Sequence, residues 1–203
     1  MGNSKEHWEN IYSNKSDNEV SWFQEIPETS LKLIEKYAFN DKSLSIADIG
    51  GGNSVLALEL VNMGFSNICV LDISSKSLDR NKERIKNTQL KWIESDILKC
   101  NDLDDITIWH DRAVLHFLTN EKDIHKYVQI ASKSIVKNGY LILGTFSETG
   151  PDKCSGLPIT KYSESSFKKV FGKDFDLIEC FEEIHTTPFN TKQNFIWGIF
   201  NRK

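Results

Sequence analysis

The chain has 203 residues, 39% of them hydrophobic, and a formal net charge of −4 at pH 7. This length suits one domain with a full core, and the negative charge excludes a general electrostatic field for nucleic acid. No apolar run approaches the roughly 20 residues that cross a bilayer, and residues 1–7 lack the apolar segment of a secretory signal. We therefore expect a single cytoplasmic domain over residues 1–203, without a nucleic-acid or membrane partner.

The first 28 residues form an aromatic N-terminal arm whose polar sequence cannot build a core of its own. It contains Trp8, Tyr12, Trp22 and Phe23. Trp8 and Tyr12 are four residues apart, which places them on one face of a short helix. The arm either covers an edge of the sheet or, because aromatic faces attract cations, acts as a lid on a positively charged ligand.

After a helix that opens at Pro27 and Thr29, an apolar run over residues 44–49 leads into Gly50, Gly51 and Gly52. Three residues without a Cβ atom permit a tight turn and a close approach of a ligand to the backbone. The apolar residues that follow, up to Gly64, predict a buried helix. We expect a strand, a ligand-binding loop and a helix.

The rest of the chain alternates strands and helices, and most of the strands end at acids. Predicted strands over residues 67–71, 90–93 and 106–109 end at Asp72, at Asp96 and before His110-Asp111-Arg112, and a helix over residues 120–136 is followed by Gly139 and a strand over 140–146. This alternation is typical of a parallel sheet with helices on both faces.

The last third of the chain departs from this alternation. After a loop over residues 147–162 and a short helix capped by Ser163, two strand-like runs over 175–184 and 193–200 are joined by turn-like residues 185–190. We therefore predict an α/β fold: a Rossmann-like, doubly wound, mostly parallel seven-stranded sheet with a C-terminal antiparallel strand pair.

The acids at the strand ends indicate the ligand, since open α/β sheets bind ligands at the carboxyl ends of their strands. Asp72 lies 22 residues after Gly50, at the spacing of a carboxylate that accepts hydrogen bonds from ribose hydroxyls. A nicotinamide dinucleotide would require glycine at position 55, where the chain has Val55. A nucleoside without phosphates tolerates several carboxylates, and S-adenosylmethionine, with its cationic sulfonium, is such a ligand.

Three segments resemble, in order, the cofactor motifs of class I S-adenosylmethionine-dependent methyltransferases: residues 48–52 (DIGGG), 70–74 (VLDIS) and 94–97 (ESDI). The resemblance covers nearly the whole chain and implies S-adenosylmethionine as the cofactor. It places the glycines under the methionine and ribose, Asp72 at the ribose hydroxyls, Asp96 at the adenine amine and Ile97 beside the ring. The predicted cofactor-binding residues are Asp48, Gly50, Gly51, Gly52, Asp72, Ile73, Asp96 and Ile97, with Trp8, Tyr12 and Trp22 from the arm.

A narrower resemblance, carried by residues 20–24 (VSWFQ), 109–113 (WHDRA) and 154–158 (CSGLP), is to small bacterial methyltransferases of poorly defined substrate. The arm resembles protein-lysine methyltransferases less closely. The chain lacks the Asn/Asp-Pro-Pro-Tyr motif of DNA amino methyltransferases, and little sequence lies outside the cofactor core. We expect a small-molecule acceptor; a single protein lysine and a non-catalytic cofactor-binding module are the alternatives.

Methyl transfer is an in-line displacement that requires positioning, with a base only where the acceptor must lose a proton. The candidate catalytic residues are Asp111, Arg112 and His116, although Asp111 would alternatively cap a helix and pair with Arg112. Cys154 and His185, in predicted loops, are candidates for contact with the acceptor, and a surface turn is the alternative for His185. The four cysteines include no C-x-x-C pair, so we predict no metal and reduced thiols.

Overall fold

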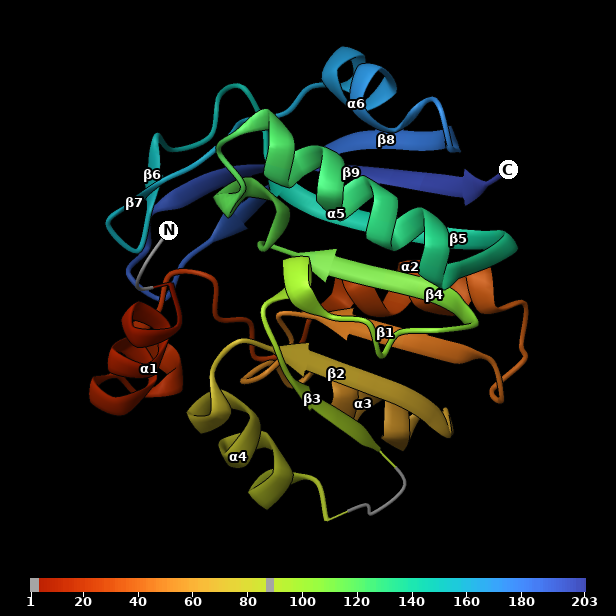
Figure 1. The fold of residues 1–203 in the computed structure, drawn as a ribbon. Coiled ribbons are helices and arrows are strands. Elements are labelled where there is room, and N and C mark those ends of the chain that lie inside the picture. Colours follow the sequence, from red (N-terminus) through yellow and green to blue (C-terminus); the bar gives the residue numbers. More distant parts are fainter. Residues whose placement is uncertain (1–3, 87–89) are drawn as a thin grey trace.

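The computed structural model describes residues 4–86 and 90–203 and contains a seven-stranded sheet (Figure 1). Its strand order is β3-β2-β1-β4-β5-β9-β8; strands β1 to β5 run parallel to one another, and β9 is antiparallel to both β5 and β8. The strands are β1 Ser45–Ile49, β2 Asn67–Asp72, β3 Lys91–Glu94, β4 Ile106–Arg112, β5 Ile135–Phe146, β8 Phe175–Thr186 and β9 Lys192–Arg202. This topology confirms the predicted fold class.

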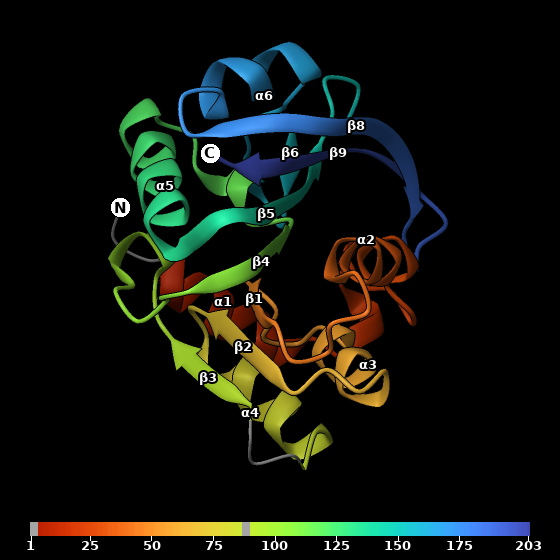
Figure 2. The ribbon, with the colours of Figure 1, turned by 90° about the vertical axis from the view of Figure 1, so that its right-hand side faces the viewer.

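Six α-helices surround the sheet in the described residues: α1 Ser4–Asn14, α2 Glu28–Ala38, α3 Leu56–Asn62, α4 Ser75–Arg84, α5 Glu121–Ser134 and α6 Glu164–Phe171. Helices α2 and α3 lie on one side of the sheet and α5 and α6 on the other (Figure 2). Short 3-10 turns, η1 Asp17–Glu19, η2 Ile97–Lys99 and η3 Leu115–Phe117, follow three of the longer elements. No helix in the described ranges is long and apolar enough to cross a membrane.

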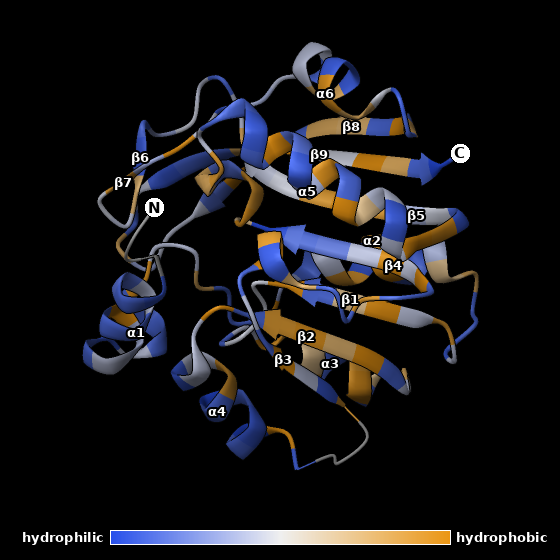
Figure 3. Ribbon diagram, in the orientation of Figure 1, coloured by the Kyte–Doolittle hydropathy of each residue, from blue (hydrophilic) through white to orange (hydrophobic). Residues whose placement is uncertain are grey.

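The central strands β1, β2 and β4 are largely apolar because each supplies both cores, whereas the edge strands β3 and β8 carry exposed charged residues. Ile108 packs with α2, α3 and α4 on one face, whereas its neighbour Trp109 packs with α5 and α6 on the other. Successive side chains of a strand point to opposite faces, so a sheet covered on both sides requires continuous apolar strands. Most of β2 is hydrophobic, as this rule requires, whereas α1 is mostly hydrophilic (Figure 3).

The structure corrects four predictions about element boundaries. Helix α5 ends at Ser134 and β5 begins at Ile135, which pairs with Ile106, so Gly139 lies inside a strand and does not end the helix. Strand β4 continues through His110, Asp111 and Arg112, because both of its faces are covered. Strands β6 Lys153–Cys154 and β7 Leu157–Pro158, which lie outside the large sheet, form a hairpin in the segment predicted as a loop. His185 lies within β8 rather than in a turn.

Candidate active site

The glycine loop between β1 and α3 is shaped by the protein's own side chains. Gly50 has a φ of 71°, and a Cβ atom there would come within 2.1 Å of Val114 Cγ2. A Cβ atom on Gly51 would lie 2.0 Å from Asp48 Oδ2, and one on Gly52 would lie 2.6 Å from Asp72 Oδ2. Gly51 and Gly52 therefore make room for two carboxylates, a reason for their presence that was not predicted beside the tight turn and the approach of a ligand.

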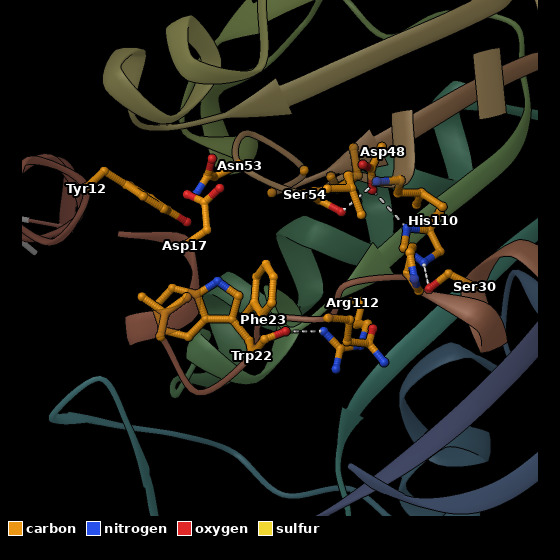
Figure 4. A pocket seen from close by; sticks show the side chains of 18 residues that line it. Tyr12, Asp17, Trp22, Phe23, Ser30, Asp48, Asn53, Ser54, His110 and Arg112 are labelled. Carbon is orange, nitrogen blue, oxygen red and sulfur yellow. Dashed lines mark hydrogen bonds and ion pairs between the residues drawn. The ribbon is translucent and has the colours of Figure 1, made fainter. Parts of the chain in front are cut away.

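Asp48 lies at the buried end of β1 and is connected to two other elements (Figure 4). Its Oδ1 atom is 2.8 Å from His110 Nδ1 on β4, and His110 Nε2 is 2.9 Å from Ser30 Oγ on α2. The second carboxylate oxygen, Oδ2, is buried and has no hydrogen-bond partner among the described residues. A buried oxygen of this kind is costly unless a ligand donates to it.

Asp72, the last residue of β2, holds two loops: the glycine loop after β1 and the turn that leads from β2 into α4. Its Oδ2 atom accepts the N–H of Gly52 at 3.1 Å, and Oδ1 accepts the N–H of Ser74 at 2.8 Å. Burial raises the pKa of Asp72 to about 6, against the lowering effect of these hydrogen bonds. At neutral pH the carboxylate is ionised and is able to accept further hydrogen bonds from hydroxyl groups.

A cavity of about 1290 Å³ runs along the carboxyl ends of the strands. This exceeds the roughly 300–1,000 Å³ of small-molecule sites, so it has room for a nucleoside cofactor and a second small molecule. Most of the predicted cofactor residues line it: Trp8, Tyr12, Trp22, Gly50, Asp72, Ile73, Asp96 and Ile97. Asp48 and Gly51 line a smaller adjoining cavity of about 60 Å³, and Gly52 lies between Asp72 and Ser77.

The aromatic arm covers both cavities. Tyr12 and Trp22 line the two of them, and the Trp8 ring packs against the rings of Trp22 and Phe117 at centroid distances of 5.7 and 5.1 Å. Asp17 fastens the arm to the domain through Arg84, 2.5 Å away. The arm therefore lines the cavities and is held against the domain, and its role as a lid on a ligand stays a prediction.

Arg112, at the end of β4, lines both cavities. Its Nη1 atom donates to the carbonyl of Trp22 at 2.9 Å, and its guanidinium lies over the Phe195 ring at 4.9 Å. The Nε atom is buried and has no partner in the described part of the chain. Burial lowers the pKa of Arg112 to about 10, so the group remains charged at neutral pH.

Comparison with known proteins identifies the chain. Residues 47–143, from β1 to β5, match the family model of a methyltransferase domain. The mouse EEF1A lysine methyltransferase 2 is 25% identical, with 92% of this chain and 76% of that protein aligned, and the human protein is 26% identical over 79% of each. The chain is a class I S-adenosylmethionine-dependent methyltransferase.

Solved structures share the fold of this methyltransferase. A methyltransferase from Anabaena variabilis superposes with a TM-score of 0.78 at 13% identity, covering 100% of this chain and 96% of the other. The N-methyltransferase NodS from Bradyrhizobium japonicum, solved with S-adenosylhomocysteine, gives a TM-score of 0.73 at 13% identity over 98% and 99% of the two chains. These identities establish a common architecture and leave the acceptor open.

The site of this methyltransferase fits S-adenosylmethionine, which is its cofactor. The unpartnered Oδ2 atom of Asp48 matches a cationic ammonium, the ionised Asp72 matches ribose hydroxyls, and the aromatic arm matches a sulfonium. When bound, the cofactor supplies an electrophilic methyl group.

The structure places Asp111 away from both cavities described above. The Oδ1 atom accepts the N–H of Val114 at 2.9 Å, and Oδ2 accepts the hydroxyl of Tyr127 at 2.6 Å. Burial raises the pKa of Asp111 to about 6. These contacts match the capping alternative, since Asp111 fixes the loop that carries Ala113 and Val114 beneath the large cavity, although Asp111 does not pair with Arg112.

His116 likewise lines neither cavity. Its ring stacks on Phe146 at 4.6 Å and packs against Phe117 at 4.3 Å, and neither ring nitrogen has a partner within the described ranges. Burial, followed by the charge of Arg112, lowers the pKa of His116 to about 3. Its imidazole is neutral and packed among aromatic rings, so a catalytic role would require it to move.

The two candidate acceptor residues lie near Arg112. Cys154 lines the large cavity, and burial raises the pKa of its thiol to about 11. His185 Nε2 is 2.8 Å from the carbonyl oxygen of Ser21 in the arm, and burial lowers its pKa. Cys154 therefore borders the space for an acceptor as a neutral thiol, whereas His185 supports the arm.

His110 and Ser30 were not among the predicted site residues. The parallel register of β1 and β4 sets Asp48 directly beside His110. That pairing was open to prediction, because both residues follow apolar runs that end at the same edge of a parallel sheet. Ser30 carried no comparable signal, since its contact with His110 depends on how α2 packs across the strands.

Proposed function

We propose that this enzyme transfers the methyl group of S-adenosylmethionine to a small-molecule acceptor by in-line displacement. The observation that carries the proposal is the closure of the cavity by the arm. Arg112 donates a hydrogen bond to the carbonyl of Trp22 at the wall of both cavities, and the arm is also fastened by Asp17 to Arg84 and by Ser21 to His185. The space that remains suits a small molecule better than a folded protein surface.

The proposed cofactor positions follow the order of the strands. Asp96 and Ile97, after β3, hold the adenine, and Asp72, at the end of β2, accepts the ribose hydroxyls. Asp48, at the end of β1, binds the ammonium of the methionine portion through its unpartnered Oδ2 atom. This order leaves the end of β4, where Arg112 lies, for the acceptor.

In this proposal the residues of the chain act mainly by positioning and by excluding water. Trp8, Tyr12 and Trp22 shield the reacting atoms, which strengthens every electrostatic interaction inside the cavity. Asp111 and His116 lie outside the two cavities, so neither is placed to accept a proton from the acceptor. The acceptor therefore presents a lone pair without help from these two groups.

A protein lysine is the second candidate acceptor. The similarity to the mouse EEF1A lysine methyltransferase 2 extends over 92% of the chain, and such an acceptor would enter as one extended side chain. This alternative requires the arm to open or a lysine side chain to thread the cavity mouth.

A radiolabelled methyl donor separates the two acceptors. A cell lysate is divided by ultrafiltration into small molecules and proteins, and each fraction is incubated with the enzyme and methyl-tritiated S-adenosylmethionine. The proposal expects label in the small-molecule fraction, dependent on enzyme and lost with Asp72→Ala. Label confined to one protein band, in lysine, would overturn it in favour of the second candidate.

A further inference from the structure

Arg112 forms no ion pair within residues 4–86 and 90–203. Its partners are a backbone carbonyl, that of Trp22, and the face of Phe195. Both contacts stabilise a cation, but neither neutralises it. The guanidinium is therefore a net positive charge at the inner wall of both cavities.

None of the neighbouring titratable groups in the described ranges forms an ion pair with Arg112. The charge of Glu183 favours the charged form of Arg112 from a distance, but the Glu183 oxygens bond to Trp197 Nε1, at 2.7 Å, and to the Thr29 hydroxyl, and not to the guanidinium. Burial and the charge of Arg112 both lower the pKa values of His116 and His185, so these rings are neutral at pH 7. Cys154 is a neutral thiol, because burial raises its pKa to about 11.

A buried charge without a counterion is costly, and the cost falls when an anion binds. Guanidinium groups match the planar geometry of carboxylates, to which they donate two parallel hydrogen bonds. The unpartnered Nε atom of Arg112 is one of the donors in that geometry. Arg112 contacts the aromatic residues Trp22 and Phe195, and Phe117 and Leu157 add apolar surface to the same large cavity.

The position of Arg112 in the sheet indicates which ligand supplies the anion. Along the strand order, β3, β2 and β1 end at Asp96, Asp72 and Gly50, the proposed cofactor positions, and β4 with Arg112 comes next. Cys154 and Leu157 of the β6–β7 hairpin close the cavity on the same side. This is the end of the cavity that the proposed function assigns to the acceptor.

We propose that Arg112 binds an anionic group of the methyl acceptor, and that the substrates of this enzyme are small acceptors with a carboxylate on an apolar or aromatic body. The inference rests on the proposed function. Its main competitor is that Arg112 holds the carboxylate of the methionine portion of the cofactor.

Calorimetry on the enzyme saturated with S-adenosylhomocysteine tests the proposal with benzoate, phenylacetate and indole-3-acetate and their primary amides. We expect at least one acid to bind and its amide to bind at least tenfold more weakly. Arg112→Gln should abolish this preference. Arg202→Gln is the matched control, since Arg202 also lies over a phenylalanine ring, that of Phe175, and donates to backbone carbonyls, but lines neither cavity; it should keep the preference.

The proposal is overturned if the amides bind as well as the acids, if no acid binds, or if Arg112→Gln keeps the preference. Arg112→Lys, which keeps the charge and loses the paired donors, should bind the acids with intermediate affinity, so that a folding defect of Arg112→Gln does not leave the test open.

The competitor is tested with 5′-methylthioadenosine, which lacks the amino-acid portion of the cofactor. If Arg112→Gln weakens S-adenosylhomocysteine tenfold and leaves 5′-methylthioadenosine unchanged, Arg112 holds the cofactor and the proposal is wrong. Label transferred to a neutral or cationic small molecule would overturn this inference but not the proposed function, whereas label confined to a protein lysine would overturn both.

Discussion

His110 Nδ1 lies 2.8 Å from Asp48 Oδ1, and this contact joins the ends of two neighbouring parallel strands in the interior. It fixes the Asp48 carboxylate so that one oxygen is occupied and the other, Oδ2, is free. Ser30 holds the other side of the imidazole, which sets the ring orientation. The geometry of the cofactor site therefore depends on a helix, α2, that contributes only one side chain to it.

Asp48→Asn should weaken S-adenosylhomocysteine far more than 5′-methylthioadenosine. An amide removes the charge from the oxygen proposed to accept the ammonium, and a charge-assisted hydrogen bond contributes roughly 1.5–3 kcal/mol, equivalent to about 10- to 150-fold in affinity. Titration calorimetry with both ligands measures the difference. Asp176→Asn, an exposed carboxylate of β8 paired with Lys203, is the control; equal losses for both ligands would contradict an ammonium contact.

Asp111→Asn should change how stability depends on pH. The pKa of Asp111 is raised in the fold, from 3.8 to about 6, so its ionisation disfavours folding above pH 6, and this penalty fades as the pH falls from about 6 to about 4. Wild-type stability should therefore lose roughly 1–1.5 kcal/mol between pH 5 and pH 7.5 through this group. Asparagine does not titrate, so the unfolding free energy of the variant, relative to that of wild type, should be higher at pH 7.5 than at pH 5.

Urea unfolding gives the difference in unfolding free energy between the variant and the wild type, measured once at pH 5 and once at pH 7.5. Other titrating groups affect both proteins equally and cancel when the two differences are compared. An equal offset at the two pH values would mean that Asp111 titrates as in the unfolded chain. Because the residue lies outside both cavities, the variant should bind S-adenosylhomocysteine with an affinity within a few-fold of wild type once it is folded.

Gly51→Ala should reduce cofactor affinity at least tenfold. The added Cβ atom would stand 2.0 Å from Asp48 Oδ2 and would displace the carboxylate from its position beside His110. Gly64→Ala is a suitable comparison, because its φ is +91° and nothing lies within 4 Å of the added atom. It should cost about 1–2 kcal/mol of stability through backbone strain and leave affinity unchanged; a similar affinity loss in both variants would refute the role given to Asp48.

The sequence was sufficient to predict the fold class, the glycine loop and the acids at the strand ends, because each depends on local patterns. A buried parallel strand must be apolar throughout, and its polar successor marks the edge at which ligands bind. Asp72 and Asp96 were predictable for this reason, and both line the cavity.

The remaining errors arose where tertiary contacts outweigh local pattern. Ile135 and Val136 fit both helical and extended spacing, and the pairing of Ile135 with Ile106 decides for the strand. Asp111 and Arg112 follow the predicted end of a strand but lie within β4. Because successive side chains of a strand point to opposite faces, Arg112 faces the cavities while Asp111 contacts Tyr127. Sequence spacing alone did not reveal which face was the functional one.

Asp17→Asn should loosen the arm and speed the release of the cofactor. Asp17 contacts Arg84 at 2.5 Å and Arg80 at 3.4 Å, and accepts a hydrogen bond from Asn53 at 2.7 Å. These groups are partly exposed, so each contact contributes about 0.2–1 kcal/mol, and their joint loss should raise the dissociation rate of S-adenosylhomocysteine roughly 3- to 10-fold. Stopped-flow fluorescence of Trp8 and Trp22 would follow the release.

Limited trypsin digestion provides the second measurement, since Lys15 lies beside the altered contact. Cleavage there should be faster in Asp17→Asn, and S-adenosylhomocysteine should protect both proteins, because the arm closes over the cavity. Glu28→Gln, which breaks an exposed pair with Lys32 on α2, should change neither cleavage nor release. If the arm became sensitive to trypsin while the release rate stayed constant, the arm would be packing on the domain without closing the cofactor site.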